Sequence, residues 1–229
     1  MKLYLRYRIN KIYLKIFNKL KFIYLKIRVW NLSNYIVKKG NKYLFIDCGA
    51  NIGQGFNFFK NYFDPKVFDY ILIEPNPNCI EHLKKLTNDK VMLIEKGVWS
   101  SEKNLKLYGI SKKEDKYFLG ASLIKDYKDN KLVENEENLP HIQTICLSNL
   151  IKDKKKEYDT IIVKMDIESS EYEVLPQLLK DNTIDLIDHI FVEFHSKYYN
   201  QEKKIKFKIL EKKLIEEIKI RKVGFTNWI

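Results

Sequence analysis

Residues 43–53 read Tyr-Leu-Phe-Ile-Asp-Cys-Gly-Ala-Asn-Ile-Gly, and this stretch decides the fold. The apolar first half is typical of a buried strand, and Asp47 to Gly53 form a tight turn that leads into helical spacing. Because Gly49 and Gly53 have no Cβ, we expect a ligand to lie against bare backbone N–H groups at the start of the helix, where anions are favoured. Asp47 adds a fixed acceptor at the end of the strand. The plainer alternative is an ordinary strand–helix turn that uses glycine only for its geometry.

A second predicted strand, residues 68–73, ends in an acidic residue. Glu74 lies 21 residues beyond Gly53 (74 − 53 = 21), and Pro75 stops the strand. An acidic residue about 20 positions after such a turn reaches the ribose hydroxyls in nucleotide-binding units. A nicotinamide fingerprint would need glycine where the chain has Asn51, so a dinucleotide is the weaker interpretation.

Composition limits the class of protein. With 229 residues, one α/β domain of ordinary size accounts for the chain. Cys48, Cys79 and Cys146 are odd in number and far apart, so we predict neither a disulfide framework nor a zinc site. Reduced thiols favour a cytoplasmic location.

The net charge of +12 comes from one end of the chain. Residues 1–42 hold twelve Lys and Arg and no acid, so 42 − 12 = 30 basic residues face all 30 acidic ones in the remainder. Residues 8–28 predict a basic amphipathic helix. Two alternatives are open: its apolar face covers the sheet, or residues 1–30 rest on an anionic membrane surface, peripherally on the inner face. The longest uncharged run there, Phe22 to Leu25, is far too short to span a membrane.

Residues 160–166 predict another strand, which ends at Asp166 and is followed closely by Glu168. The carboxyl ends of such strands hold the ligands of open α/β sheets. The spacing of Ser170 and Glu173 fits a capping box and predicts that a helix starts there.

The last strand of this kind, residues 189–194, leads into His195. By alternation along the strand, we expect Glu193 and His195 to share a face and to flank the same cleft edge as Asp166. A histidine at that edge is a candidate for acid–base work, with a hydrogen-bonded structural residue as the alternative.

The first turn and the residues after the second strand resemble a known family. Asp47-Cys-Gly-Ala-Asn-Ile-Gly53 with Ile73-Glu-Pro75 looks like the first two motifs of class I S-adenosylmethionine methyltransferases, and the first motif in particular resembles the FkbM family of O-methyltransferases. Residues 164–171 and 193–195 resemble that family's Lys-x-Asp-x-Glu-Gly-x-Glu and Glu-x-His signatures. Ser169 stands where the family usually has glycine.

The resemblance implies a Rossmann-like α/β fold over residues 43–229, a mostly parallel central sheet flanked by helices. Residues 1–42 then form a basic helical extension. An insertion at about residues 100–159 helps to shape the acceptor pocket in this family, and within it the candidates for substrate contact are Tyr117, Phe118, Ser122 and Tyr127.

The resemblance also implies S-adenosyl-L-methionine as cofactor and S-adenosyl-L-homocysteine as product. Asp47 is assigned to the cofactor as a fixed acceptor. The other residues assigned to it are Gly49, Ala50, Asn51 and Gly53 at its methionine end, Glu74 at the ribose, Val98 beside the adenine, and Asp166 at the amino group or the methyl-transfer region. For Val98 the alternative is core packing.

An alcohol becomes a good nucleophile when a base within about 2.6–3.2 Å removes its proton. We predict His195 as this base, with Glu168 and Glu193 as rival bases or as groups that orient the imidazole. A divalent cation held by Asp166, Glu168 and Glu193 is a weaker alternative, and no metal is predicted.

The acceptors that the resemblance implies are sugar hydroxyls of glycans or glycolipids, or hydroxyls of small secondary metabolites. A 2′-O-methyltransferase acting on RNA is a further alternative, but residues 43–229 carry no net positive charge to surround a cleft, so a nucleic acid is disfavoured. A nucleotide-binding module without catalysis is disfavoured because it need not retain so many polar residues at strand ends. The oligomeric state is not indicated.

Overall fold

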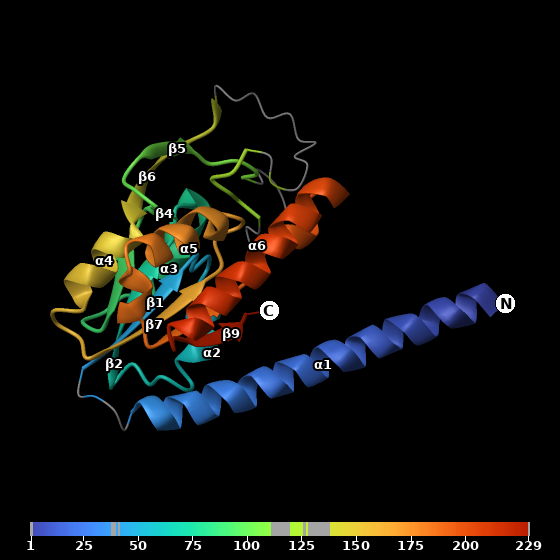
Figure 1. Cartoon of the computed structure of the whole chain (residues 1–229), viewed down its shortest axis with the longest axis horizontal. Coiled ribbons are helices and arrows are strands. Elements are labelled where there is room, and N and C mark those ends of the chain that lie inside the picture. The colour runs from blue at the N-terminus through green and yellow to red at the C-terminus, as the bar shows by residue number, and fades with distance from the viewer. Residues whose placement is uncertain are drawn as a thin grey trace. The chain divides into compact units, whose positions relative to one another are not determined.

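The computed structural model describes residues 2–37, 40, 42–110, 120–125, 127 and 138–228, with the side chains of the first helix described at residue 16 and from residue 19 onward. The chain divides into two compact units, Met1–Gly40 and Asn41–Trp228. The first unit is built on a single helix, α1 (Lys2–Ile36) (Figure 1). Within the described residues, no helix combines the length and the apolar character that crossing a bilayer requires.

The second unit is organised around a six-stranded sheet in the order β3-β2-β1-β7-β8-β9. Every pair of neighbouring strands in it is parallel. The strands are β1 (Tyr43–Cys48), β2 (Phe68–Ile73), β3 (Val91–Ile94), β7 (Thr160–Met165), β8 (His189–Val192) and β9 (Gly224–Asn227). The predicted Rossmann-like parallel sheet is therefore confirmed, and burial on both faces explains why its central strands are nearly continuous apolar runs.

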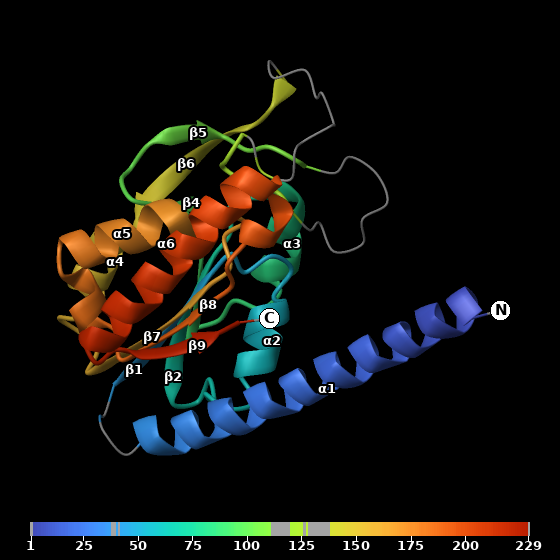
Figure 2. The same ribbon diagram turned by 45° about the vertical axis from the view of Figure 1, so that its right-hand side comes forward.

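Helices cover both faces of this sheet (Figure 2). One face carries α2 (Gln54–Phe59) and α3 (Pro77–Lys84), and the other carries α4 (Leu147–Lys154), α5 (Glu171–Lys180) and α6 (Gln201–Ile220). Along β1 the side chains alternate: Leu44 and Ile46 belong to an aliphatic core, whereas the ring of Phe45 lies 4.8 Å from that of Phe59 in α2. The two faces thus have chemically different cores, aliphatic and aromatic.

A smaller sheet lies above the main one in Figure 1 and belongs largely to the predicted insertion. It consists of β4 (Gly97–Trp99), β6 (His141–Cys146) and β5 (Asn104–Lys106), in that order. β6 pairs parallel with β4 and antiparallel with β5. This sheet fixes both ends of the insertion beside the main sheet.

The predicted start of α5 is correct, but the predicted capping box is wrong. Ser170 precedes the helix and its side chain makes no capping hydrogen bond. Its backbone is already helical, with φ −68° and ψ −14°, whereas a side-chain cap requires an extended residue at that position.

Candidate active site

The turn that joins β1 to α2, residues 49–53, is called the glycine turn below. Gly49 and Gly53 have φ values of +77° and +91°, which favour glycine. A Cβ at Gly49 would overlap the backbone carbonyl oxygen of Asp166, and one at Gly53 would overlap the side chain of Leu86. The two glycines therefore let the turn pack closely against the end of β7 and against the residues after α3.

The N–H groups of the glycine turn are already used within the protein. Gly49 and Ala50 donate to the carbonyl of Ile73 at 2.9 and 3.1 Å, Asn51 donates to Glu74, and Gly53 donates to the carbonyl of Ala50 at 2.8 Å. The prediction of a bare N–H cradle for an anionic group is therefore wrong. The glycines serve the geometry of the turn, as the plainer alternative expected.

Asp47 is fully buried beneath this turn. Its Oδ1 lies 3.1 Å from Nζ of Lys164, and that ammonium also donates to the carbonyl of Gly49 at 2.8 Å and lies 3.4 Å from Oδ2 of Asp166. Burial raises the pKa of Asp47, and the charge of Lys164 opposes that rise. Since a buried charge is tolerated only when paired, Asp47 and Lys164 bind the ends of β1 and β7 together, and Asp47 has no exposed surface for a ligand.

Lys164 was quoted in the family signature but received no role from the sequence. The signal was present, because a lysine inside the apolar run Thr-Ile-Ile-Val-Lys-Met of β7 must find a buried acidic partner.

Glu74 connects the ends of β1 and β2. Its Oε2 accepts the N–H of Asn51 and its Oε1 accepts the N–H of Asn76, both at 2.8 Å. Burial raises the pKa of Glu74 to about 7, although the two N–H donors oppose the shift. The glycine turn and the acidic strand end therefore meet at one edge, and each carboxylate oxygen keeps a lone pair that can accept a ribose hydroxyl.

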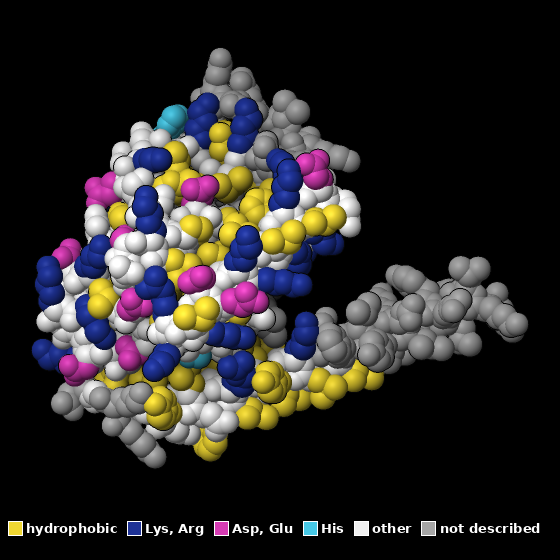
Figure 3. Space-filling view, in the orientation of Figure 1, with side chains coloured by type: hydrophobic (Ala, Val, Ile, Leu, Met, Phe, Trp, Pro, Cys, Tyr) yellow, Lys and Arg dark blue, Asp and Glu magenta, His cyan; other side chains and the backbone are white. Residues whose placement is uncertain are grey.

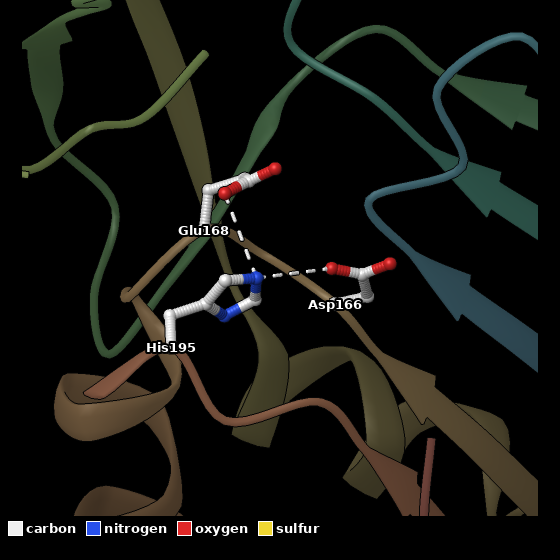
Figure 4. A group of neighbouring side chains, drawn as sticks. All are labelled: Asp166, Glu168 and His195. Atoms are coloured by element: carbon white, nitrogen blue, oxygen red, sulfur yellow. Dashed lines mark ion pairs between the residues drawn. The ribbon is translucent and has the colours of Figure 1, made fainter. Parts of the chain in front are cut away.

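The centre of the site is the His195 cluster, which comprises His195, Asp166 and Glu168 (Figure 4). Both carboxylates point toward Nε2 of the imidazole, and each of the two nitrogen–oxygen distances is 3.5 Å. The side chain of His195 is only 3% exposed, whereas those of Asp166 and Glu168 are 26% and 22% exposed. The two carboxylates are thus the parts of the cluster that a bound molecule can reach.

Glu171, the first residue of α5, holds the other side of the imidazole. Its Oε1 lies 3.0 Å from Nδ1 of His195 and also accepts the backbone N–H of His195 at 3.0 Å. Glu171 is fully buried, and burial raises its pKa. Glu171 was quoted in the family signature, but no role was assigned to it from the sequence.

The three neighbouring carboxylates decide the charge of the imidazole. Burial by itself would lower the pKa of His195, but hydrogen bonds to Asp166 and Glu171 and the charges of Glu171 and Glu168 raise it to about 11. Burial would raise the pKa of Asp166, but Lys164 and His195 hold it well below its usual range. The three carboxylates therefore favour the imidazolium form of His195 at neutral pH.

Glu193 does not share a face with His195, and that prediction is wrong. β8 ends at Val192, so the strand alternation does not continue to His195. Glu193 instead pairs with Lys197, with Oε1 and Nζ 2.9 Å apart. Glu171 occupies the position beside the imidazole that we expected for Glu193.

The insertion reaches the cluster through Glu168. Ser122 donates from Oγ to the backbone carbonyl of Glu168 at 2.6 Å, and the hydroxyl of Tyr127 donates to the Glu168 carboxylate. Both residues are buried, so they position Glu168 rather than present a surface to a substrate. The other two candidates for substrate contact, Tyr117 and Phe118, lie outside the described residues.

The backbone beside Glu168 is unusual. Glu168 and Ser169 have φ values of +49° and +82°, in the left-handed region that non-glycine residues rarely adopt. Ser169 thus keeps the conformation that the family's usual glycine suits. Such strain is often retained where it aims a functional side chain.

Val98 in β4 is buried in the aliphatic core, so the packing alternative describes its side chain. Its contact with an adenine stays a prediction.

The His195 cluster also offers one ligand atom from each residue within 4.8 Å of the others, a spacing that a metal ion could use. Hard oxygen ligands with one imidazole would suit a divalent cation. The cation site suggested from the sequence used Glu193 together with Asp166 and Glu168. In the structure, His195 takes the place of Glu193 among these possible metal ligands. The same spacing equally suits an imidazolium between two carboxylates, so the cluster does not by itself require a metal.

Comparisons with known proteins bear on this geometry. A family model described as methyltransferase FkbM domain matches residues 47–225. A solved structure of methyltransferase FkbM from Methylobacillus flagellatus KT is similar at 17% sequence identity, with a TM-score of 0.39. The match covers 63% of this chain and 30% of that one, so this chain spans less than a third of the length of that protein. No curated protein matches the chain.

Proposed function

Because the chain belongs to the FkbM methyltransferase family, we propose that it transfers a methyl group from S-adenosylmethionine to a hydroxyl group of a sugar in a glycan or glycolipid. The observation that carries this proposal is the meeting of Glu74, the glycine turn and the His195 cluster at the carboxyl edge of one parallel sheet. Open α/β sheets bind their ligands at this edge.

The charges of the site fit a cationic cofactor. The groups that contact one another there are the carboxylates of Asp47, Asp166, Glu168 and Glu171 and the two cations Lys164 and His195. The acids exceed the cations, and Asp166 and Glu168 are the partly exposed ones, so a sulfonium would be stabilised beside them. When bound, the cofactor supplies an electrophilic methyl group. Glu74 would accept hydrogen bonds from its ribose.

His195 is the proposed base, and Glu171 gives it the required orientation. With the Nδ1 proton donated to Glu171, Nε2 faces Asp166 and Glu168, where an acceptor hydroxyl can lie. Since the pKa of His195 is about 11, Nε2 carries a proton at neutral pH until another cation reaches the carboxylates. A positive charge beside Asp166 would lower that pKa and release Nε2 to accept the acceptor's proton.

Glu168 is the rival base, because its carboxylate is partly exposed and lies beside the same position. The hydroxyl of Tyr127 already donates to this carboxylate and occupies part of its capacity to accept hydrogen bonds. Its partial exposure also lets it accept a hydrogen bond from the acceptor without removing the proton. We therefore assign Glu168 to orientation and His195 to proton transfer.

A sugar acceptor is supported by an aromatic ring at the edge of the cluster. Tyr198 is 38% exposed, and its ring stacks on that of His195 with centroids 5.9 Å apart. A flat, amphipathic ring of this kind suits a sugar, which presents both C–H and hydroxyl groups. A small secondary metabolite with a hydroxyl group is the second candidate, since the same ring would accept it.

The test is mass spectrometry of the purified protein for S-adenosyl compounds, followed by transfer of labelled methyl groups to glycans, glycolipids, RNA and small hydroxylated metabolites. We expect the cofactor or its product to copurify and the label to enter a carbohydrate hydroxyl. Label entering RNA or a metabolite would replace the proposed acceptor class. If calorimetry detected no heat with either S-adenosyl compound, the cofactor assignment itself would be wrong.

A further inference from the structure

We propose that α1 binds the surface of an anionic lipid bilayer and lies along it, an interaction that is independent of the reaction proposed above. The inference concerns the first unit alone and rests on its exposed side chains. The apolar stripe is defined here as Ile16, Leu20, Ile23, Tyr24, Ile27 and Trp30, whose exposed fractions range from 44% to 63%.

These six residues form one continuous face. At about 100° per residue they fall within a sector of about 120°. Figure 3 shows hydrophobic side chains running along the described part of α1. An exposed apolar face of this length is unusual for a protein surface and marks a site of interaction.

Basic residues lie at both edges of the apolar stripe. By the same helical spacing, Lys19 and Lys26 fall beside Trp30 at one edge, and Lys21 and Arg28 fall beyond Tyr24 at the other. All four cations are exposed. Long basic side chains at the edges of an apolar face can reach lipid headgroups while that face enters the acyl boundary.

The absence of acidic residues identifies the occupant. Residues 1–42 contain twelve basic residues and no Asp or Glu. If two copies of α1 met through the apolar stripe, the flanking cations of both would come together without any acid from this segment to pair with them. An RNA would pair with the cations but would leave the apolar stripe exposed to water. An anionic bilayer satisfies both the charge and the apolar face.

The bilayer is bound at its surface rather than crossed. Cations recur along the helix as far as Arg28, and the longest uncharged run, the nine residues from Val29 to Val37, is far shorter than the roughly 20 residues that a spanning helix needs. α1 therefore has the features of an interfacial helix, which lies in the headgroup region.

The experiment is flotation of the full-length protein with vesicles of phosphatidylcholine, alone and mixed with phosphatidylglycerol. The stripe variant is Ile23→Ser with Ile27→Ser. Its matched control is Ile205→Ser with Ile209→Ser, a pair at the same spacing on α6 with exposed fractions of 52% and 53%. A charge variant, Lys19→Gln with Lys26→Gln, tests the edge of the stripe. All these side chains are exposed, and unchanged melting temperatures verify that each variant is folded.

We expect the wild type and the control variant to float with the mixed vesicles. The amount of the stripe variant that floats should be lower by about tenfold or more. The charge variant and high salt should also weaken binding. Equal flotation with phosphatidylcholine alone, no flotation at all, or an unaffected stripe variant would each overturn the proposal. Two other outcomes would also overturn the proposal, each combined with no binding to vesicles. In one, the stripe variant loses a dimer that light scattering detects in the wild type; in the other, it loses RNA binding.

Discussion

Replacing Glu168 with glutamine should lower the pKa of His195. The substitution keeps the shape of the side chain and removes one of the three negative charges around the imidazole. Without that charge the imidazolium is less stabilised, so His195 should release its proton at a lower pH.

The size of the shift follows from the distance. Oε2 of Glu168 lies 3.5 Å from Nε2 of His195, which corresponds to about 5 kcal/mol at an effective dielectric constant of about 20. Because Glu168 is 22% exposed, solvent reduces this value, and a change of about 1–3 pKa units is expected for a neighbouring charge. Asp166 and Glu171 remain, so the pKa should stay above the ordinary value of about 6.5.

The assay is an NMR titration of the histidine rings in cofactor-free protein, with the His195 signal assigned from its loss in His195→Asn. Glu193→Gln is the matched control, because Glu193 pairs with Lys197 rather than with the imidazole. Its titration should equal that of the wild type. If His195 titrates near its ordinary pKa in the wild type, or if Glu168→Gln leaves it unchanged, the electrostatic account of the site is refuted.

Three further predictions follow from single residues. Glu74→Gln should weaken S-adenosylhomocysteine binding by about 10–100-fold in calorimetry, because the charge-assisted hydrogen bonds to the ribose are lost. With a pKa of about 7 before binding, wild-type Glu74 gains its charge as pH rises, so affinity should increase from pH about 6 to about 8; a flat profile would remove Glu74 from the ribose site. Glu171→Gln should lower kcat by about 100-fold and shift its pH profile while the cofactor still binds, since the imidazole loses its orienting carboxylate; an unchanged profile would leave Glu171 a structural role only. Ser169→Gly should raise the free energy of unfolding by about 0.5–1 kcal/mol because φ is +82° there, whereas Ser170→Gly, at φ −68°, should lower it; chemical denaturation measures both, and equal signs would contradict the strain.

The sequence was informative where the structure depends on local pattern. Strands β1, β2 and β7 follow from short apolar runs. The spacing of Ser170 and Glu173 located the start of α5, although the capping box itself does not form. The parallel order of the sheet followed from the family resemblance, and it brought Asp166 and Glu74 to the same edge. The family model confirms that resemblance over residues 47–225.

The sequence misled us where a residue's role depends on its neighbours in space. Strand alternation placed Glu193 beside His195, but β8 ends first and Glu171 takes that position. The two turn glycines suggested space for a ligand. In the folded chain, β7 fills the space beside Gly49.

By itself, the sequence determined the class of fold, the residues at the carboxyl edge and the one-sided distribution of basic charge, because periodicity, turn chemistry and composition are properties of short stretches. Only the tertiary structure decided which of those residues meet. Lys164 binds the carbonyl of Gly49 across 115 positions of sequence, and Glu171 holds His195 across 24. Burial and the distance between charges set the pKa of His195, and neither quantity exists until the strands are packed side by side.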